Sequence, residues 1–222
     1  MAIVNIIVYG ASDHGKYTVD IVERQGLHTV VGLVDDYVER GNELYGYPVL
    51  GTGGRLRALS SEHDFCGGVI AVGDNHVRAR IAERILRVIP TFQFVSVVHP
   101  FTSIGRDTSI GEGSVVMAGA VVNGSCAVGK HCFIATKASL DHDSVLGDFA
   151  SMSPGATTGG NVTVGEYATL SIGSTVVHGK SVGAHTVIGA GSTVIGDIQS
   201  HVVAYGTPAR VVRQRFEGEP YL

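Results

Sequence analysis

The chain has 222 residues, of which 31 are glycine and 16% are charged, and its formal net charge is −4. A chain with this charge is a poor partner for nucleic acid or an anionic membrane surface, and no apolar run approaches the ~20 residues that span a bilayer. The first five residues lack the basic region and cleavage site of a signal peptide, and the three cysteines form no paired motif. We therefore expect a cytoplasmic protein with reduced thiols.

The first part of the chain alternates predicted strands and helices. Strands are expected at residues 3–9, 29–34, 69–72 and 92–98, a hairpin or loop around 45–50, and helices at 16–25, 54–60 and 76–87. This alternation predicts a small parallel sheet of the Rossmann-like kind. We therefore predict an α/β domain over residues 1–98 and a second domain over residues 99–222, with His99-Pro100 at the change.

A glycine-rich turn follows the first predicted strand. Gly10 to Gly15 joins a strand to a helix, where backbone N–H groups and the helix dipole favour a phosphate. The segment is not GxGxxG; it matches GxxxxGK with Lys16, but Tyr17 stands where an ATP-binding loop needs a short hydroxyl. A nucleotide-fragment site is the favoured interpretation, and a plain turn without a ligand is the alternative. Polar residues at the ends of the next two strands support the favoured interpretation: Asp35, Asp36, Gly73, Asp74 and Asn75.

The second part of the chain is a repeat. From Ile104 to Gln199 it runs through sixteen hexapeptides without an insertion, and every sixth residue is apolar apart from Thr158. A period of six nested in eighteen predicts three short strands per coil, stacked as a parallel β-helix. We expect the recurring glycines to allow turns that a side chain would strain, and the residues after Val194 to cap the open end. Glycine recurs every eighteen residues, at Gly111, Gly129, Gly147, Gly165 and Gly183.

One histidine stands out against this repeat. His142 lies between Asp141 and Asp143, and an imidazole held between carboxylates stays basic and oriented, as a general base requires. The eighteen-residue period places Gly124 and Gly160 directly below and above it, which leaves a notch with exposed backbone N–H groups. We interpret this notch as a catalytic site; a surface histidine between two solvated acids is the alternative.

The histidine spacing does not favour a metal. His142 and His178 are two coils apart, about 9.6 Å at the usual strand spacing, too far to share a zinc ion. His131 and His185 share another column three coils apart. We therefore predict no metal site, although a trimer interface can gather histidines from two chains.

Several motifs together resemble the sialic-acid-synthesis and pilin-glycosylation class of sugar O/N-acyltransferases. The resemblance implies a left-handed β-helix with a small Rossmann-like N-terminal domain; the left hand comes from the family, because parallel crossovers generally favour the right hand. It also implies a homotrimer with active sites between subunits. The motifs that carry it, besides the hexapeptides, are Tyr9-Gly10-Ala11-Ser12, His14-Gly15, Asp35-Asp36, Ala71-Val72-Gly73-Asp74-Asn75, His99-Pro100 and Gly206-Thr207-Pro208-Ala209.

The same resemblance implies an activity and its residues. The most similar members transfer an acetyl group from acetyl-CoA to the 4-amino group of a nucleotide-linked 4-amino-4,6-dideoxy sugar. His142 would be the base, Asp143 its acidic partner and Gly160 the backbone donor to the thioester carbonyl. Ser151 stands where some relatives have a second histidine near the thioester, so the resemblance does not carry that histidine over to this chain. The nucleotide sugar would meet Gly10, Ser12, His14, Asp35, Asp36, Asp74 and Asn75, and acetyl-CoA would meet Gly160, Gly173, Gly191, Lys180 and Arg210.

Three other functions stay open at this point. They are O-acetylation of a sugar hydroxyl, a γ-type carbonic anhydrase, and a non-catalytic solenoid that binds a nucleotide sugar. The residues do not distinguish among GDP-perosamine, UDP-linked bacillosamine precursors and dTDP-linked viosamine. They also do not identify the glycan, whether lipopolysaccharide, O-antigen or glycoprotein, that the product enters.

Overall fold

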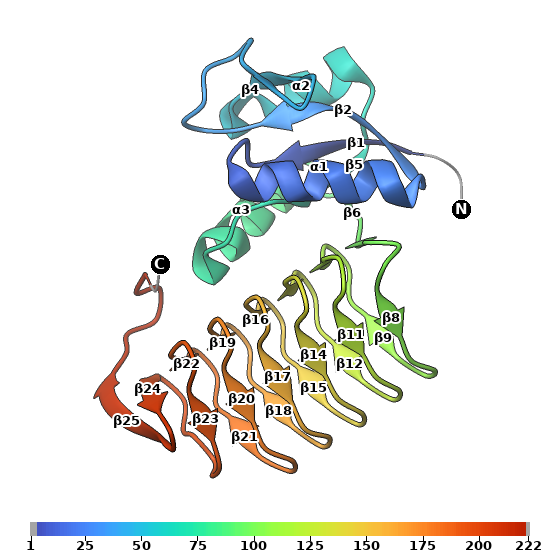
Figure 1. The fold of residues 1–222 in the computed structure, drawn as a ribbon. Coiled ribbons are helices and arrows are strands. Elements are labelled where there is room, and N and C mark those ends of the chain that lie inside the picture. The colour runs from blue at the N-terminus through green and yellow to red at the C-terminus, as the bar shows by residue number, and fades with distance from the viewer. Residues whose placement is uncertain (1–3, 221–222) are drawn as a thin grey trace. The chain divides into compact units, whose positions relative to one another are not determined.

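The structure, a computed structural model, describes residues 4–220 and divides into two compact units (Figure 1). Of the described residues, one unit contains 4–73 and 77–100, and the other contains 74–76 and 101–220. The short segment 74–76 therefore groups with the repeat, whereas the sequence suggested that it ends a strand of the first unit. No helix within residues 4–220 has the length and apolar character needed to cross a membrane.

The first unit is a six-stranded sheet with helices. Its strand order is β3-β4-β2-β1-β5-β6, and every pairing is parallel except that of the β3–β4 hairpin. The doubly wound arrangement confirms the predicted Rossmann-like class. The elements are β1 (Val4–Tyr9), α1 (Asp13–Gln25), β2 (His28–Val34), β3 (Glu43–Leu44), β4 (Tyr47–Gly51), η1 (Gly53–Arg55), α2 (Leu56–His63), β5 (Gly67–Ile70), α3 (Asn75–Val88), β6 (Gln93–Phe94) and β7 (Val97–Val98).

Several element boundaries in this unit differ from the predictions by one to three residues, and the differences include those at α1, β5 and the last predicted strand. Helix α1 begins at Asp13, three residues earlier than expected, because Ser12 is extended and Asp13 suits the positive end of a helix. The third long strand ends at Ile70, and the last predicted strand divides into β6 and β7. Ile3, the first residue of the first predicted strand, lies outside the described residues.

The second unit is a left-handed parallel β-helix, as predicted. Each coil has three two-residue strands, and each strand pairs with the strand eighteen residues away, for example Val121 with Ser139. The strands make three faces, which we number in chain order. Face 1 contains β8 (Ser103–Ile104), β11 (Val121–Val122), β14 (Ser139–Leu140), β17 (Thr157–Thr158), β20 (Thr175–Val176) and β23 (Thr193–Val194). Face 2 contains β9 (Ser109–Ile110), β12 (Ala127–Val128), β15 (Val145–Leu146), β18 (Thr163–Val164) and β21 (Ser181–Val182). Face 3 includes β10 (Val115–Val116), β13 (Phe133–Ile134), β16 (Ser151–Met152), β19 (Thr169–Leu170), β22 (Val187–Ile188), β24 (Val202–Gly206) and β25 (Ala209–Gln214).

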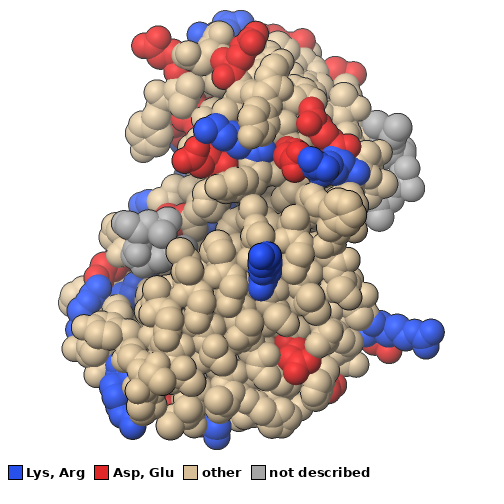
Figure 2. Space-filling view, in the orientation of Figure 1, with Lys and Arg blue, Asp and Glu red and all other residues tan. Residues whose placement is uncertain are grey.

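The predicted sixth-residue apolar positions fill the interior of the prism. Val122, Ile134, Leu140 and Met152 are fully buried, and each such side chain contributes about 1.5–3 kcal/mol of hydrophobic stabilisation. Ile104 is an exception at 39% exposed, since it lies in the first coil. Over the solenoid, the face turned to the viewer in Figure 2 carries few charged side chains.

The glycines that recur every eighteen residues do not form the turns that the sequence suggested. Gly111, Gly129, Gly147, Gly165 and Gly183 have no left-handed backbone; instead, an added Cβ would lie 2.3–2.5 Å from atoms of the adjacent coil. These glycines therefore permit close stacking. The left-handed turns fall elsewhere, at every sixth residue from Asp107 to Gly191, and many of them carry side chains. Asp143 is one of these residues, with φ of 57°.

The solenoid also continues beyond Val194. Ile198 bridges Val182, and Ala204 of β24 pairs with Ile188 of β22, so the last coil is shortened to a step of sixteen residues. Strand β25 then folds back antiparallel on β24. The tail thus extends the winding before it forms a hairpin, whereas the sequence suggested that it begins directly with a cap.

Candidate functional site

The glycine-rich turn of the first unit is held by the carboxylates that follow β2. Asp35 Oδ2 accepts the Ala11 N–H at 2.7 Å, and its Oδ1 accepts the N–H groups of Tyr37 and Val38 at 2.8 and 3.0 Å. Gly10 has φ of 120°, and an added Cβ would lie 2.5 Å from the carbonyl oxygen of Ala71. The sequence predicted that Asp35 meets a ribose or base; both of its oxygens instead fix the loop.

The second carboxylate, Asp36, binds a hydroxyl, a guanidinium and a backbone N–H beside this turn. Its Oδ2 accepts the Tyr9 hydroxyl at 2.9 Å and pairs with Arg84 at 2.5 Å, while its Oδ1 accepts the Gly53 N–H at 2.9 Å. Arg84 also donates to the Tyr9 hydroxyl and lies over the Tyr9 ring. This network fixes the Arg84 guanidinium, paired with Asp36, beside the glycine turn, where its N–H groups can also donate to a phosphate.

A cavity of about 520 Å³ opens beside these two networks. It brings together the predicted residues Gly10, Ser12, Asp35 and Asp36, and its size suits a nucleotide-sized ligand. The sequence did not identify the aromatic, apolar and basic residues that complete its lining, because they come from separate elements: Tyr9, Tyr37, Val38, Val72, Val77, Arg80, Ile81 and Arg84.

The other predicted nucleotide contacts lie elsewhere. His14 is half-buried in α1 outside the cavity lining, and burial and the charge of Arg78 lower its pKa. Asn75 is fully buried: its side-chain nitrogen donates to the Tyr167 carbonyl at 3.1 Å and its oxygen accepts the Ser151 hydroxyl at 2.6 Å. Asp74 groups with the solenoid together with Asn75. The prediction that Asn75 contacts a nucleotide is therefore wrong, and its side chain instead fixes one face of the solenoid.

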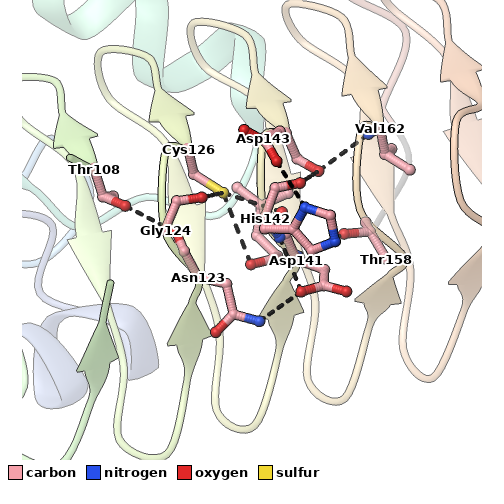
Figure 3. Close-up of polar contacts among 11 residues, drawn as sticks. Thr108, Asn123, Gly124, Cys126, Asp141, His142, Asp143, Thr158 and Val162 are labelled. Carbon is pink, nitrogen blue, oxygen red and sulfur yellow. Dashed lines mark hydrogen bonds and ion pairs between the residues drawn. The ribbon is translucent and has the colours of Figure 1, made fainter. Parts of the chain in front are cut away.

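The predicted catalytic histidine lies at the corner between faces 1 and 2 of the solenoid, which we call the His142 corner (Figure 3). Its loop is fixed by the neighbouring Asp141, whose Oδ1 accepts the His142 N–H at 2.9 Å and the Asn123 side-chain N–H at 2.5 Å. The Asp141 N–H donates to the Thr158 hydroxyl at 3.0 Å. Asn123 and His142 together keep the pKa of Asp141 below its usual value, with the Asn123 hydrogen bond as the largest cause.

Thr158 and Asn123 are supporting residues that the sequence analysis missed, although both left a signal. Thr158 is the single lapse in the apolar series, and the structure explains it, because its hydroxyl is needed to hold the Asp141 loop. Asn123 lies eighteen residues before Asp141, so the coil period places it directly alongside. A search for polar residues at eighteen-residue steps from His142 and its neighbours would have found it.

The imidazole of His142 is oriented by Asp143. The distance from His142 Nδ1 to Asp143 Oδ2 is 2.7 Å, and both side chains are about half exposed. This hydrogen bond is the main cause that raises the pKa of His142 above its ordinary value. With Nδ1 engaged, Nε2 is left as the basic nitrogen, and it faces Gly160: an added Cβ there would lie 2.4 Å from it. Because Asp143 has a left-handed backbone, its carboxylate can reach back to the imidazole of the preceding residue, His142.

Gly160 is the residue that the sequence predicted as the backbone donor. It is buried, it lies one coil from His142, and the Asn161 N–H donates to the His142 carbonyl at 2.9 Å. Within residues 4–220, the Gly160 N–H makes no hydrogen bond. A base nitrogen beside an unused N–H is the arrangement that acyl transfer requires, since one group takes a proton and the other stabilises an oxyanion.

The remaining predicted cofactor contacts fall at two places. Gly173 and Gly191 lie at the corner between faces 3 and 1, in left-handed turns with open space around them, so face 1 separates them from Gly160. Lys180 lies at the His142 corner. The pKa of Asp197 is lowered mainly by hydrogen bonds with Ser181, and the charge of Lys180 lowers it further. Arg210 lines a cavity of about 200 Å³ with that same Asp197.

One group of possible metal ligands lies away from the His142 corner. Donor atoms of His76, His185 and Glu217 lie within 4.8 Å of one another, and the His76 Nε2 to His185 Nδ1 distance is 3.3 Å. Burial is the main cause that lowers the pKa of both histidines, and the charge of Arg215 lowers both further. The same positive charge would repel a cation, so we assign no metal to this cluster. The sequence misjudged one distance: the rings of His142 and His178 are 6.2 Å apart, closer than their two-coil separation suggested.

Known proteins resemble this chain in sequence and in fold. The family model described as the PglD N-terminal domain matches residues 5–85. GDP-perosamine N-acetyltransferase from Escherichia coli O157:H7 is 26% identical over 160 residues, which are 70% of each chain. The crystal structure of PerB from Caulobacter crescentus with CoA and GDP-perosamine is 32% identical, with a TM-score of 0.88 over 96% of this chain and 99% of that one. The acetyltransferase domain of PglB from Neisseria gonorrhoeae, in complex with acetyl coenzyme A, is 31% identical, with a TM-score of 0.86 over 95% of this chain and 100% of that one.

The fold and these similarities define a β-helix acyltransferase, an enzyme that moves an acyl group between two substrates. The similarity to solved structures spans almost the whole chain at more than 30% identity, so it concerns both units. The chain belongs to the sugar N-acyltransferase family that PerB and the PglB acetyltransferase domain represent.

Proposed function

We propose that this protein transfers the acetyl group of acetyl-CoA to the 4-amino group of a nucleotide-linked 4-amino-4,6-dideoxy sugar. The main support is the His142 corner, where a base nitrogen and an unused backbone N–H lie side by side. The relatives with bound CoA, acetyl-CoA or GDP-perosamine support the choice of both substrates. A GDP-linked sugar is the first candidate, since two perosamine N-acetyltransferases are among the most similar proteins.

In this proposal the reaction is a direct displacement. His142 Nε2 takes a proton from the sugar amine, and the amine nitrogen attacks the thioester carbon as the C–S bond breaks. Asp143 holds the ring through Nδ1 and stabilises the imidazolium that forms, which fits the raised pKa of His142. The Gly160 N–H stabilises the oxyanion. No acyl-enzyme is required, because a neutral amine is already a good nucleophile; the buried Cys126 and Cys132 take no part.

The two units take different substrates in this proposal, with residues 1–98 as the nucleotide-sugar domain and residues 99–222 as the acetyltransferase domain. The cavity lined by Gly10, Ser12, Asp35 and Asp36 takes the nucleotide, and Arg80 and Arg84 supply positive charge toward its phosphates. Acetyl-CoA runs along the later coils from Gly160, with Lys180 and Arg210 as phosphate contacts and Gly173 and Gly191 contributed from the facing corner.

We also propose a cytoplasmic homotrimer with active sites between subunits. The exposed apolar side chains Val145, Ile172 and Ile195 and the weakly charged solenoid face support such an assembly. Gly160 and Gly173 lie on different corners of one chain, so two neighbouring chains would together supply both of these acetyl-CoA contacts to one site. Light scattering coupled to size exclusion would test this, with a monomer as the contradicting result.

The test of the activity is CoA release from acetyl-CoA with GDP-, UDP- and dTDP-linked 4-amino sugars, each matched with its 4-hydroxy analogue. The expected result is turnover of one amino sugar, with a product heavier by one acetyl group and no turnover of the hydroxy analogue. Turnover of the hydroxy sugar alone would instead identify an O-acetyltransferase. Binding of nucleotide sugar without CoA release from any member of the panel would identify a binding protein.

A further inference from the structure

We propose that His178 is a second catalytic histidine of the His142 corner, the general acid that protonates the departing CoA sulfur. The proposal rests on the proposed acetyl transfer and adds a residue to it. His178 is two coils from His142 in the same column, with Gly160 between them.

The first observation is the approach of the two rings. Residues two coils apart are separated by about 9.6 Å along the stack, yet the His142 and His178 ring centroids are 6.2 Å apart and tilted by 49°. The rings therefore lean toward each other over Gly160, which has no side chain to separate them. A carbonyl oxygen that accepts the Gly160 N–H would have one imidazole on each side.

The second observation is the carboxylate beside both rings. Asp141 is fixed by Asn123 and by the His142 N–H, and the charges of His142 and His178 both help to keep the pKa of Asp141 low. His178 is exposed, so a substrate can reach it. The fixed Asp141 carboxylate therefore places a negative charge near both imidazoles.

The third observation is that the two histidines are unequal. His142 Nδ1 is bound to Asp143, which suits a base held in one orientation. Cys126 at the same corner is buried and donates to the Asp141 carbonyl at 3.0 Å, so its thiol is not placed to act as the acid. His178 is the remaining imidazole at this corner among the residues that the structure describes, and it lies across Gly160 from the base.

The step balances with one proton at each histidine. The amine nitrogen forms a bond to the thioester carbon, and its proton passes to His142. The C–S bond breaks with its electron pair on sulfur, and the His178 imidazolium gives that sulfur a proton. The products are the N-acetyl sugar and the free thiol of CoA; His142 then loses a proton to water, and His178 regains one. With one histidine on each side of the thioester, the amine proton and the sulfur proton are handled by different rings. Neither ring then has to rotate between the amine nitrogen and the sulfur.

The experiment compares the wild type with His178→Gln and His178→Asn, using acetyl-CoA and its oxygen-ester analogue, in which oxygen replaces the leaving sulfur. We expect kcat with acetyl-CoA to fall by about 10²-fold, the lower end for general acid–base catalysis, because a thiolate is a fair leaving group. The loss should be larger with the oxygen ester, whose alkoxide needs a proton more. The alkaline limb of the kcat profile should also disappear, while the acid limb stays. His63→Gln in α2 is the control, with wild-type kinetics expected.

Several results would overturn the assignment. An equal loss with both esters, or an unchanged alkaline limb, would exclude an acid role at the leaving atom. A rise in KM for acetyl-CoA with unchanged kcat would identify His178 as a binding contact. A wild-type enzyme without activity on any amino sugar would refute the proposed function, and this assignment with it, whereas an active wild type with equally active His178 variants would refute this assignment alone.

Discussion

Replacement of Gly160 by alanine isolates the contact between the base and the backbone donor. The variant keeps the N–H group, and Gly160 does not have a left-handed backbone, so alanine is compatible with the local conformation. The added Cβ would lie 2.4 Å from Nε2 and 2.5 Å from Cε1 of His142. Ordinary contacts of this kind begin at 3.4 Å, so the imidazole must move by about 1.0 Å. His142 is half exposed, so the ring can move without unfolding the coil.

The expected cost follows from this displacement. A misplacement of 1 Å at a reacting group costs about 10²-fold in rate, or about 2.7 kcal/mol of transition-state stabilisation. We expect kcat/KM for CoA release to fall by that factor, with a melting temperature close to that of the wild type. Gly54→Ala is the control, because its added Cβ would find Thr52 at 3.7 Å, an ordinary contact.

A double variant makes this test sharper. In a His142→Asn background the base is already absent, so Gly160→Ala should cause little further loss. Full additivity of the two losses would show that the alanine acts by some other route. Wild-type turnover by a folded Gly160→Ala enzyme would refute the assignment of His142 Nε2 as the base beside this amide.

Four further predictions concern the same corner and the histidine cluster. His142→Asn should lower kcat by about 10²–10⁴-fold with no change in oligomeric state, and retained activity would contradict its role. Asp143→Asn replaces the charged acceptor that raises the pKa of His142 with a neutral one, so the acid limb of the kcat/KM profile should move to lower pH; an unmoved limb would exclude His142 as the titrating base. Thr158→Val should keep the coil but release the Asp141 N–H, which costs about 1–3 kcal/mol if that group is left buried, and activity should fall while far-UV circular dichroism stays the same. Folding lowers the pKa values of His76 and His185, so their contribution to the free energy of unfolding is complete above the ordinary histidine pKa of about 6.5 and is lost as the pH falls toward the lowered values. Urea unfolding of His185→Asn should therefore show a smaller loss of stability between pH 7.5 and 5.5 than the wild type. An equal loss in both proteins would contradict this.

The sequence predicts the solenoid well because its signal is repeated. Each coil buries the same positions, so the period of six nested in eighteen is sufficient to place Val122, Leu140 and Val176 on one interior line. The same periodicity places Gly160 over His142. The sequence does not show that glycines such as Gly129 permit coil contact, because turn formation and close approach select the same residue.

The α/β unit is less predictable in detail because its important contacts are long-range. Asp35 and Asp36 are visible as strand-end carboxylates, but the sequence does not show that they bind the Ala11 and Gly53 amides. The prediction for Asn75 is wrong for a related reason: its position after a strand suggests a ligand site, while its actual partners are about 76 to 94 residues away in the chain. Composition and local pattern carry no information about such pairings.

The stacking of the His142 corner gives the solenoid the properties of a ruler. Asn123, Asp141, His142, Gly160 and His178 reach the site from four successive coils, so one step of eighteen residues moves a functional group by about 4.8 Å along a straight line. The functional groups of such a site are therefore spaced at regular intervals along one line, whereas a conventional pocket surrounds its ligand. Exchange of the side chains in one coil would change the contacts at one position along a linear substrate. Insertion of a whole coil between Gly160 and His178 would leave every coil able to fold, but it would move the two histidines one coil spacing further apart.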